Sequence, residues 1–202
     1  MWTTYCQKLN IDEEISKVMN EVFKFDKITK VQNIVINEFI KNQDVIVKSI
    51  TGSGKTLSYL IPLFQRLITY SKTNENYKNS ILSLILLPSR ELSTQVYSNV
   101  MEFINNMQYK FTAQLLIGGK KVENDLQKIN ENIPNIIIAT PGRFLDITEQ
   151  KNLNFSDLVL LVLDEADKML DMGFEVALSQ ILSKLPKKAA FLRLANFCAK
   201  RK

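Results

Sequence analysis

The sequence predicts an α/β domain of three layers, in which helices cover both faces of a mostly parallel central sheet. Short apolar segments alternate along the chain with segments whose apolar residues recur at helical spacing. The short segments are apolar on consecutive residues, which is typical of strands buried on both faces. The length of 202 residues fits one compact domain with a substantial core.

Each element follows from a local pattern. Apolar residues recur every three or four positions after Asp12 and again after Thr29, so we expect a helix after each. A β-branched segment at 44–49 indicates a strand, and a glycine-containing turn then opens a helix from Lys55 to about Thr69. The other expected strands are 82–87, 113–117, 135–139 and 158–163, and the other expected helices are 90–106, 121–131, 142–150 and 176–185.

The composition excludes several kinds of site. The chain contains no His, which excludes imidazole metal ligands and nucleophiles that depend on a His base. Cys6 and Cys198 lie near opposite ends, so they supply neither a disulfide framework nor a four-ligand zinc cluster. No apolar segment has the length of a membrane span, and we expect no membrane partner. Four of the net +5 charges come from residues 189–202, so the basicity alone does not indicate a nucleic-acid partner.

The strongest local signal lies between the first strand and the helix that follows it. Its eight residues are Ser49, Ile50, Thr51, Gly52, Ser53, Gly54, Lys55 and Thr56. Small residues at such a turn let backbone N–H groups close around phosphate oxygens, and the helix N-terminus adds a favourable potential. Lys55 would then bind the outer phosphates, and the Thr56 hydroxyl would take a Mg²⁺ position. Ser49 stands where Gly is usual, and the alternative is an ordinary turn with an incidental lysine.

A second signal follows the strand that ends at Leu163, where Asp164 and Glu165 come next. An apolar strand that ends in acids places them at the carboxyl edge of the sheet, where ligands of such folds bind. Asp164 would hold Mg²⁺ through water, and Glu165 would orient and deprotonate the water that attacks the γ-phosphate. Taken alone, the two acids indicate an acidic first helical turn. Together with the phosphate loop, they predict Lys55, Asp164 and Glu165 as catalytic residues that act on a nucleoside triphosphate with Mg²⁺.

The tetrad Asp164-Glu165-Ala166-Asp167 resembles the tetrad that gives the DEAD-box RNA helicases their name. The resemblance implies a RecA-like P-loop NTPase domain that binds ATP and RNA. It also implies that the chain is similar to the first of the two RecA-like domains of such enzymes. Weaker similarities, among them the segment 136–143, point to the branch that works on precursors of large-subunit ribosomal RNA.

Upstream of the phosphate loop, residues 25–32 resemble the adenine-reading Q motif of the same family, with Ile28 where Pro is usual. The resemblance implies that Phe25 and Gln32 bind the nucleotide. An amide such as that of Gln32 donates and accepts at once, which suits the edge of adenine and rejects guanine. Trp2 or Tyr5 is a candidate for an aromatic that stacks on the adenine, and the alternative is that both pack into the core.

Three further elements resemble the segments that line the RNA path in this family. Residues 88–92 resemble its PTREL element with Ser89 in place of Thr, Gly118-Gly119 its GG element, and residues 139–143 its TPGR element. The resemblance implies contacts with RNA phosphate and ribose from Pro88, Arg90, Gly119, Thr140, Pro141, Gly142 and Arg143. Arginines can pair with phosphates, and glycine backbone allows close approach. Each element alone is ordinary turn chemistry, but five elements in the order of the family favour the resemblance.

The resemblance covers about residues 2–188. It divides the chain into an N-terminal flank with the Q motif at 1–33, a RecA-like ATP-binding domain at 34–188 and an atypical basic tail at 189–202. We expect the second RecA-like domain, with its arginine finger, to be missing. The segment 189–195 is apolar enough to fill a central place in the sheet, but Arg193 would then lie mid-strand, where an unpaired charge is costly. We therefore expect the tail not to be native to the fold.

These observations predict an ATP-dependent RNA helicase that unwinds or remodels RNA in ribosomal RNA processing. The expected partners are single-stranded RNA or a short RNA duplex, and we expect a monomer in the nucleus or nucleolus, with the cytoplasm as the alternative. The chain alone is expected to lack unwinding activity. The alternatives are a catalytically silent ATP- and RNA-binding fragment, an unrelated P-loop ATPase, and an α/β domain without activity.

Overall fold

The computed structural model describes residues 2–40, 44–50, 52–186 and 190–196, the last of these as a backbone strand. Its six strands are β1 (Val45–Ser49), β2 (Ser83–Leu86), β3 (Ala113–Leu116), β4 (Ile136–Ala139), β5 (Leu160–Leu163) and β6 (Ala190–Asn196). They form one sheet in the order β1-β6-β5-β2-β4-β3, and every pairing is parallel. The predicted parallel α/β fold is therefore confirmed.

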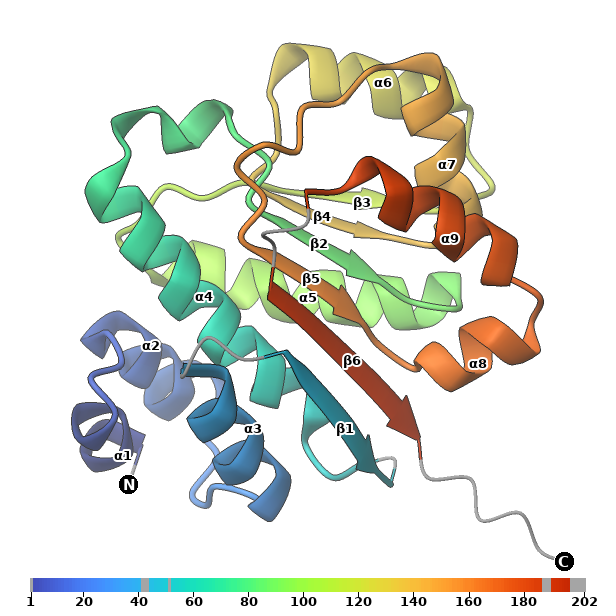
Figure 1. Cartoon of the computed structure of the whole chain (residues 1–202). Coiled ribbons are helices and arrows are strands. Elements are labelled where there is room, and N and C mark those ends of the chain that lie inside the picture. The colour runs from blue at the N-terminus through green and yellow to red at the C-terminus, as the bar shows by residue number, and fades with distance from the viewer. Residues whose placement is uncertain (1, 41–43, 51, 187–189, 197–202) are drawn as a thin grey trace, which may run out of the picture.

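The helices alternate with the strands along the chain (Figure 1). They are α1 (Trp2–Lys8), α2 (Glu13–Val18), α3 (Lys30–Ile40), α4 (Lys55–Thr73), α5 (Arg90–Asn106), α6 (Val122–Glu131), α7 (Pro141–Gln150), α8 (Ala166–Asp171) and α9 (Glu175–Lys184). A π-helical turn at Met19–Phe23 continues α2, and a 3₁₀ turn lies at Glu75–Asn79. The sequence pattern missed α1 and α8, because helices of six or seven residues show too few repeats of an apolar stripe.

Two hydrophobic clusters pack between the three layers, one on each face of the sheet. Leu160 and Val162 of β5 belong to a cluster with residues of α1 to α5. Leu161 and Leu163 belong to a second cluster with residues of α6 to α9. Because successive strand residues point to opposite faces, both faces of the sheet are covered, and this explains why the strand segments are apolar on consecutive residues.

The strand β6 fills the central place that the sequence left in doubt. Its backbone pairs with β1 on one side and with β5 on the other, so that Arg193 lies mid-strand opposite Ile46 and Leu163. The interpretation that this segment could complete the sheet is confirmed for residues 190–196. The proposal that the tail is foreign to the fold stays a prediction, and residues 189 and 197–202 lie outside the described residues.

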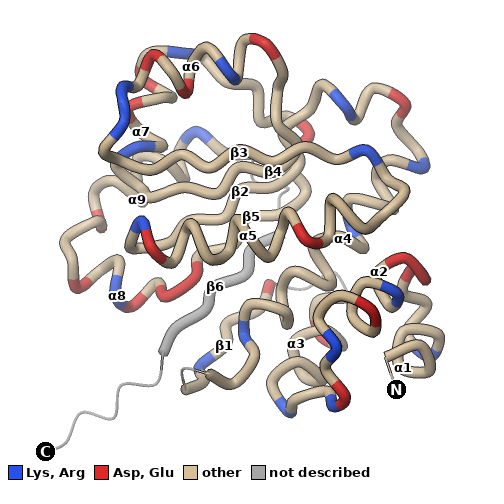
Figure 2. The backbone as a smooth tube through the Cα atoms, turned by 180° about the vertical axis from the view of Figure 1, so that it is seen from behind, with Lys and Arg blue, Asp and Glu red and all other residues tan. Residues whose placement is uncertain are grey.

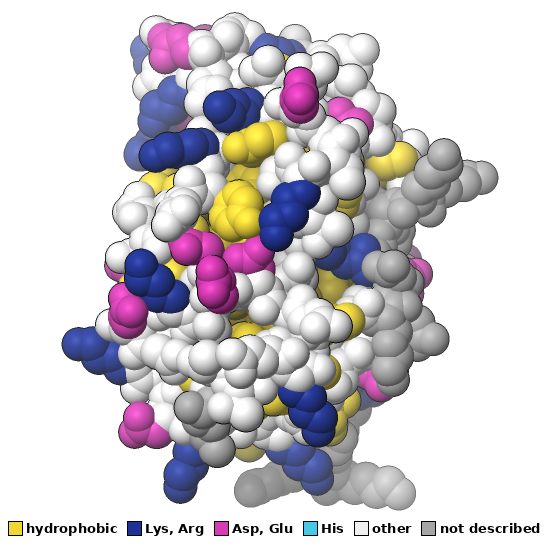
Figure 3. Space-filling model, turned by 90° about the vertical axis from the view of Figure 1, so that its left-hand side faces the viewer, with side chains coloured by type: hydrophobic (Ala, Val, Ile, Leu, Met, Phe, Trp, Pro, Cys, Tyr) yellow, Lys and Arg dark blue, Asp and Glu magenta, His cyan; other side chains and the backbone are white. Residues whose placement is uncertain are grey.

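The N-terminal helices belong to the same core as the strands. Asp12 connects three segments, since its Oδ2 accepts hydrogen bonds from Lys72 Nζ (2.9 Å) and Tyr109 OH (3.1 Å), while its N–H donates to Gln65 Oε1 (2.7 Å). On this face of the molecule, hydrophobic side chains lie between charged ones (Figure 3). The predicted boundary between residues 33 and 34 falls inside α3 (Lys30–Ile40), and the division of the chain into a flank and a RecA-like domain stays a prediction.

Charged residues of both signs are spread over the outer helices, including α6 (Figure 2). The net charge therefore does not mark a site. Within the described part of the chain, no helix combines the length and the apolar character that a membrane span requires.

Candidate functional site

The predicted site residues meet at one edge of the sheet, where β1, β2, β4 and β5 end (Figure 1). One pocket there is lined by the phosphate loop and the end of β5, with Gly52, Gly54, Lys55, Thr56, Asp164 and Glu165 among its residues. A second pocket is lined by Pro88, Arg90, Gly118, Thr140, Gly142 and Arg143, among others. The structure thus brings the two predicted groups of residues into two neighbouring pockets of one edge.

The phosphate loop has the backbone shape of an anion cradle. Gly52 and Gly54 have φ angles of +78° and +88°, which residues with a side chain rarely adopt. The helix α4 begins directly after Gly54, so its free N–H groups point into the loop. A Cβ atom on Gly54 would lie 2.7 Å from Gln32 Nε2, which adds a steric reason for glycine. Thr51, the predicted third residue of the loop, lies outside the described residues.

Side chains of the loop bind its own backbone. Lys55 Nζ donates hydrogen bonds to the carbonyl oxygens of Ser49 (3.0 Å) and Ile50 (3.1 Å). The hydroxyls of Ser49 and Ser53 lie 3.1 Å apart, within hydrogen-bonding distance. The ammonium group therefore lies over the loop, where phosphate oxygens could replace the two carbonyl acceptors.

Gln32 connects the Q motif to the phosphate loop. Its Oε1 accepts from the Thr29 N–H (2.9 Å), and its Nε2 donates to the Gly54 carbonyl oxygen (3.3 Å). The Thr29 hydroxyl in turn accepts from the Gln32 N–H (3.2 Å). Only 3% of Gln32 is exposed, so the amide is fixed from both sides and aligns the Q motif with the loop.

The aromatic residues proposed to bind the adenine differ in how far they are buried. Trp2 is fully buried, and its Nε1 donates to the Phe25 carbonyl oxygen (2.8 Å). The hydroxyl of Tyr5 accepts from Asn37 Nδ2 (3.2 Å) on α3. The alternative that Trp2 packs into the core is therefore confirmed. Phe25 is 51% exposed and stacks on Phe23, so its ring is available to a ligand.

Asp164 combines deep burial with an unused oxygen. Its Oδ2 accepts from the Tyr59 hydroxyl (3.0 Å), whereas the buried Oδ1 has no hydrogen-bond partner among the described residues. With 6% of the residue exposed, burial raises the pKa of Asp164 to about 6. A buried carboxylate oxygen without a partner is costly unless a cation or an ordered water binds it, so this position fits a hydrated Mg²⁺.

Glu165 is held in an unusual conformation. Its φ angle of +54° lies in the left-handed region, and its Oε2 lies 2.8 Å from Lys168 Nζ. The residue is 8% exposed and lines the pocket beside Thr56. A left-handed residue other than glycine costs free energy, and such strain occurs at functional sites.

Tyr59 is the hydrogen-bond partner of Asp164, and sequence analysis missed it. It is fully buried one helical turn after Thr56, and its hydroxyl also interacts with the Thr56 side chain. Burial, followed by the charge of Asp164, raises the pKa of Tyr59 well above its usual value, so it remains a neutral donor. The only signal in the sequence is its helical spacing from Thr56.

In the second pocket, an exposed arginine rests on two glycines. A Cβ atom on Gly118 would lie 3.1 Å from Arg90 Nη2, and one on Gly119 would lie 2.9 Å from Arg90 Nη1. Gly119 has a φ angle of +98°, which also favours glycine. The GG element therefore makes room for the guanidinium, which lies open to a phosphate ligand.

Arg143 differs from the sequence expectation, which paired it with RNA phosphate. Its guanidinium is buried and bound inside the domain, because Nη1 lies 2.9 Å from Asp125 Oδ2 and Nη2 donates to the Lys120 carbonyl oxygen. Thr140 precedes α7 and Pro141 occupies its first turn, so the free N–H groups of α7 face the same pocket. A contact between RNA and Arg143 stays a prediction, whereas its pairing with Asp125 is a feature of the fold.

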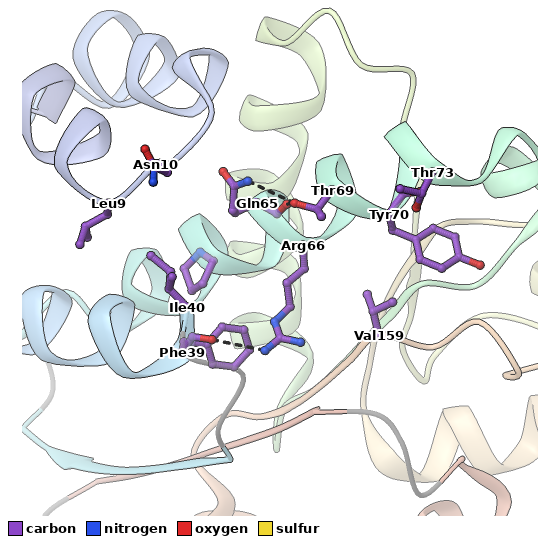
Figure 4. A pocket seen from close by; sticks show the side chains of 11 residues that line it. Leu9, Asn10, Phe39, Ile40, Gln65, Arg66, Thr69, Tyr70, Thr73 and Val159 are labelled. Atoms are coloured by element: carbon purple, nitrogen blue, oxygen red, sulfur yellow. Dashed lines mark hydrogen bonds between the residues drawn. The ribbon is translucent and has the colours of Figure 1, made fainter.

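A third pocket lies away from this edge, between the first helices and the far half of α4 (Figure 4). Arg66 covers the Phe39 ring at 4.6 Å and donates to the Phe39 carbonyl oxygen (3.3 Å). None of the predicted site residues lines this pocket.

Comparisons with known proteins agree with this arrangement. The model of the family described as DEAD/DEAH box helicase matches residues 29–195. The chain is 40% identical over 179 residues to the ATP-dependent rRNA helicase SPB4 of Candida glabrata and 39% identical over 193 residues to the ATP-dependent RNA helicase DDX55 of Xenopus laevis. These matches cover 86% and 92% of the chain but 29% and 31% of the relatives.

Solved structures are similar over nearly the whole chain. The DEAD-box helicase Mss116 bound to ssRNA and UDP-BeF matches with a TM-score of 0.83 and 32% identity, over 94% of this chain and 40% of that chain. A DEAD box protein from Methanococcus jannaschii matches with a TM-score of 0.79 and 31% identity, over 94% of this chain and 49% of that chain. The chain thus spans less than a third of the two curated relatives and less than half of either solved chain.

Proposed function

The chain belongs to the DEAD/DEAH box helicase family, and from this premise we propose that it provides the ATP- and RNA-binding RecA-like domain of an ATP-dependent RNA helicase. One observation carries the proposal. A single edge of the sheet carries the phosphate loop, the Asp164 Oδ1 that has no hydrogen-bond partner among the described residues, and the Arg90 guanidinium that rests on two glycines. Nucleotide and RNA would therefore bind to adjacent pockets of one rigid domain.

In the nucleotide pocket each residue has a distinct role. The N–H groups after Gly52 and Gly54 surround the phosphates, and Lys55 Nζ exchanges its two carbonyl acceptors for phosphate oxygens. Thr56 and Asp164 would hold a hydrated Mg²⁺, which would neutralise charge on the phosphates. Glu165 orients the attacking water and accepts its proton.

The base and the RNA are bound by different means. Phe25 offers an exposed ring to the adenine. Gln32 would recognise the edge of adenine by exchanging the Thr29 N–H and the Gly54 carbonyl oxygen, its partners in this structure, for atoms of the base. Arg90 contacts RNA phosphates, and the backbone of Gly119 and of Thr140 to Gly142 allows the sugar–phosphate chain to approach. Since these contacts reach no base edges, we expect little sequence preference.

The name of the relative from Candida glabrata, an rRNA helicase, supports a role in ribosomal RNA processing. We propose the nucleus or nucleolus as the site of action, with the cytoplasm as the alternative. We propose single-stranded RNA or a short duplex as substrate, and a monomer. In related phosphoryl-transfer enzymes an arginine finger from outside the phosphate loop raises turnover by roughly 10³ to 10⁵. We therefore expect the 202-residue chain alone to bind its ligands but to hydrolyse ATP weakly and not to unwind.

Equilibrium binding to the purified chain tests this function. A fluorescent ATP analogue should bind in Mg²⁺ and be released by EDTA, and Lys55→Ala should abolish this binding while circular dichroism shows an unchanged fold. Labelled single-stranded RNA should bind, and Arg90→Ala should weaken that binding with no effect on the nucleotide.

Binding of neither ligand by folded protein would refute the proposal. Binding of both with no ATP turnover in any RNA concentration would favour the catalytically silent fragment. Equal affinity for ATP and GTP in the unsubstituted chain, unchanged in Gln32→Ala, would favour an unrelated P-loop ATPase.

A further inference from the structure

We propose that Asp125 is a positioning residue for the RNA pocket, acting through Arg143 and the loop Gly118–Lys120 on the guanidinium of Arg90. Asp125 lies on α6, outside every element that resembles a family motif. The inference rests on the proposed function, because it assigns Arg90 to RNA phosphate. Three contacts carry it.

The first contact is a buried ion pair. Arg143 Nη1 and Asp125 Oδ2 lie 2.9 Å apart, and 5% and 7% of the two side chains are exposed. The Asp125 carbonyl oxygen also accepts from Gln114 Nε2 (3.0 Å), which fixes the start of α6 against β3. Both ends of the pair are thus held by the fold, and the guanidinium has one defined orientation.

The second contact leads from the pair to the GG element. While Nη1 of Arg143 faces Asp125, Nη2 donates to the carbonyl oxygen of Lys120. The planar guanidinium presents its donors at fixed angles, so the carboxylate on one side determines where the carbonyl oxygen lies on the other. The loop that follows β3 is therefore anchored one residue after Gly119.

The third contact connects the loop to Arg90. Because the position of a Cβ on Gly119 would lie only 2.9 Å from Arg90 Nη1, a small displacement of this loop moves the surface on which the guanidinium rests. Arg90 is exposed, and Gly118 of the same loop approaches it as well, since a Cβ atom there would lie 3.1 Å from Arg90 Nη2. The placement of its charge thus depends on the loop.

A purely structural explanation fits less well. A buried ion pair contributes little net stability compared with apolar residues of similar size, because both charges must leave water. What such a pair supplies is orientation, and here the oriented group holds a loop that faces the RNA pocket. Asp146 lies 3.9 Å from Arg143 Nε, is exposed and lines the RNA pocket itself. Asp146→Asn therefore removes a charge near the same guanidinium without breaking the buried pair, and we expect it not to weaken RNA binding.

The experiment compares Asp125→Asn, Asp125→Glu and Asp146→Asn in the full chain, each alone and combined with Arg90→Ala. Anisotropy of a labelled oligouridine gives RNA affinity, a fluorescent ATP analogue gives nucleotide affinity, and amide hydrogen exchange reports on residues 118–121 without RNA. We expect Asp125→Asn to weaken RNA binding about tenfold, to leave ATP affinity unchanged, and to accelerate exchange of the loop. In the Arg90→Ala background the same substitution should have almost no effect on RNA affinity. Asp125→Glu should restore most of the loss.

The outcomes separate the inference from the function on which it rests. If Asp125→Asn lowers RNA and ATP affinity equally, or acts equally with and without Arg90, its role is structural and the inference is wrong. If loop exchange and RNA affinity match those of Asp146→Asn, the inference is wrong while the proposed function stands. Absence of RNA binding in the unsubstituted, folded chain would overturn both.

Discussion

Asp164 and Asp125 are two buried carboxylates at the same edge of the sheet, and their direct hydrogen-bond partners differ in charge. Burial raises the pKa of both. Asp125 meets the guanidinium of Arg143, which supplies a full counter-charge. Asp164 meets the neutral hydroxyl of Tyr59, and its Oδ1 has no partner among the described residues. The fold itself supplies the partner of Asp125, whereas the carboxylate of Asp164 is left incomplete and is suited to a ligand.

The largest expected effect tests the paired carboxylate. Arg143→Ala leaves Asp125 buried without its counter-charge, so we expect the free energy of unfolding to fall by about 3 kcal/mol. Urea denaturation at pH 7.5 measures it. The double variant Arg143→Ala with Asp125→Ala should recover part of the loss, because no buried charge then lacks a partner. A single variant as stable as the unsubstituted chain would show that the pair is solvated, and would remove the contrast with Asp164.

The second prediction concerns Asp164, and here we expect removal of the charge to raise the free energy of unfolding rather than to lower it. The pKa of Asp164 is about 6 in the folded chain and roughly 4 in an unfolded one. The folded state therefore binds the proton more tightly, so the charged carboxylate destabilises it above pH 6, and this penalty fades as the pH falls toward 4. In EDTA, Asp164→Asn should be more stable than the unsubstituted chain by about 2 kcal/mol at pH 7.5 and equal to it near pH 4.

Urea denaturation at the two pH values checks this difference, and Asp125→Asn serves as the contrasting variant because it should destabilise at pH 7.5. The same Asp164→Asn protein should lose Mg²⁺-dependent nucleotide binding. Loss of stability at pH 7.5 would mean that the Asp164 carboxylate is paired after all.

A smaller effect on the free energy of unfolding is expected at Tyr59, the neutral partner of Asp164. Tyr59→Phe removes the hydroxyl that donates to Asp164 Oδ2 and preserves the buried ring, so we expect a loss of about 1 kcal/mol at pH 7.5. Since the hydrogen bond from Tyr59 lowers the pKa of Asp164, that pKa should rise in the variant. Carboxyl titration followed by NMR measures it, and an unchanged titration would show that the hydroxyl does not hold the carboxylate.

The smallest effect is expected on the exposed side of Arg143. Asp146 is largely solvated and 3.9 Å from the guanidinium, so Asp146→Asn should change the free energy of unfolding by less than about 0.5 kcal/mol. The same denaturation assay applies. A loss similar to that of Arg143→Ala would mean that Asp146, rather than Asp125, balances the guanidinium.

Local patterns carried much of the prediction. The strands, the phosphate loop and the place of Asp164 follow from short segments whose meaning does not depend on distant residues. The partners do not follow in this way. Asp125 and Arg143 lie on successive helices with a strand between them, and the burial of Trp2 depends on how α1 packs. Tertiary contacts determine this pairing and this burial, and the spacing of residues along the sequence does not predict them.

The position of β6 bears on how the chain acquires its nucleotide site during synthesis. Within the described sheet, the strand β1 that leads into the phosphate loop pairs only with β6, which is synthesised roughly 150 residues after it. A ribosome-bound chain could therefore assemble β2 to β5 and their helices before β6 is available to pair with β1. ATP could stabilise the domain only after β6 has left the ribosome, so nucleotide binding would report the completion of folding rather than promote its early steps.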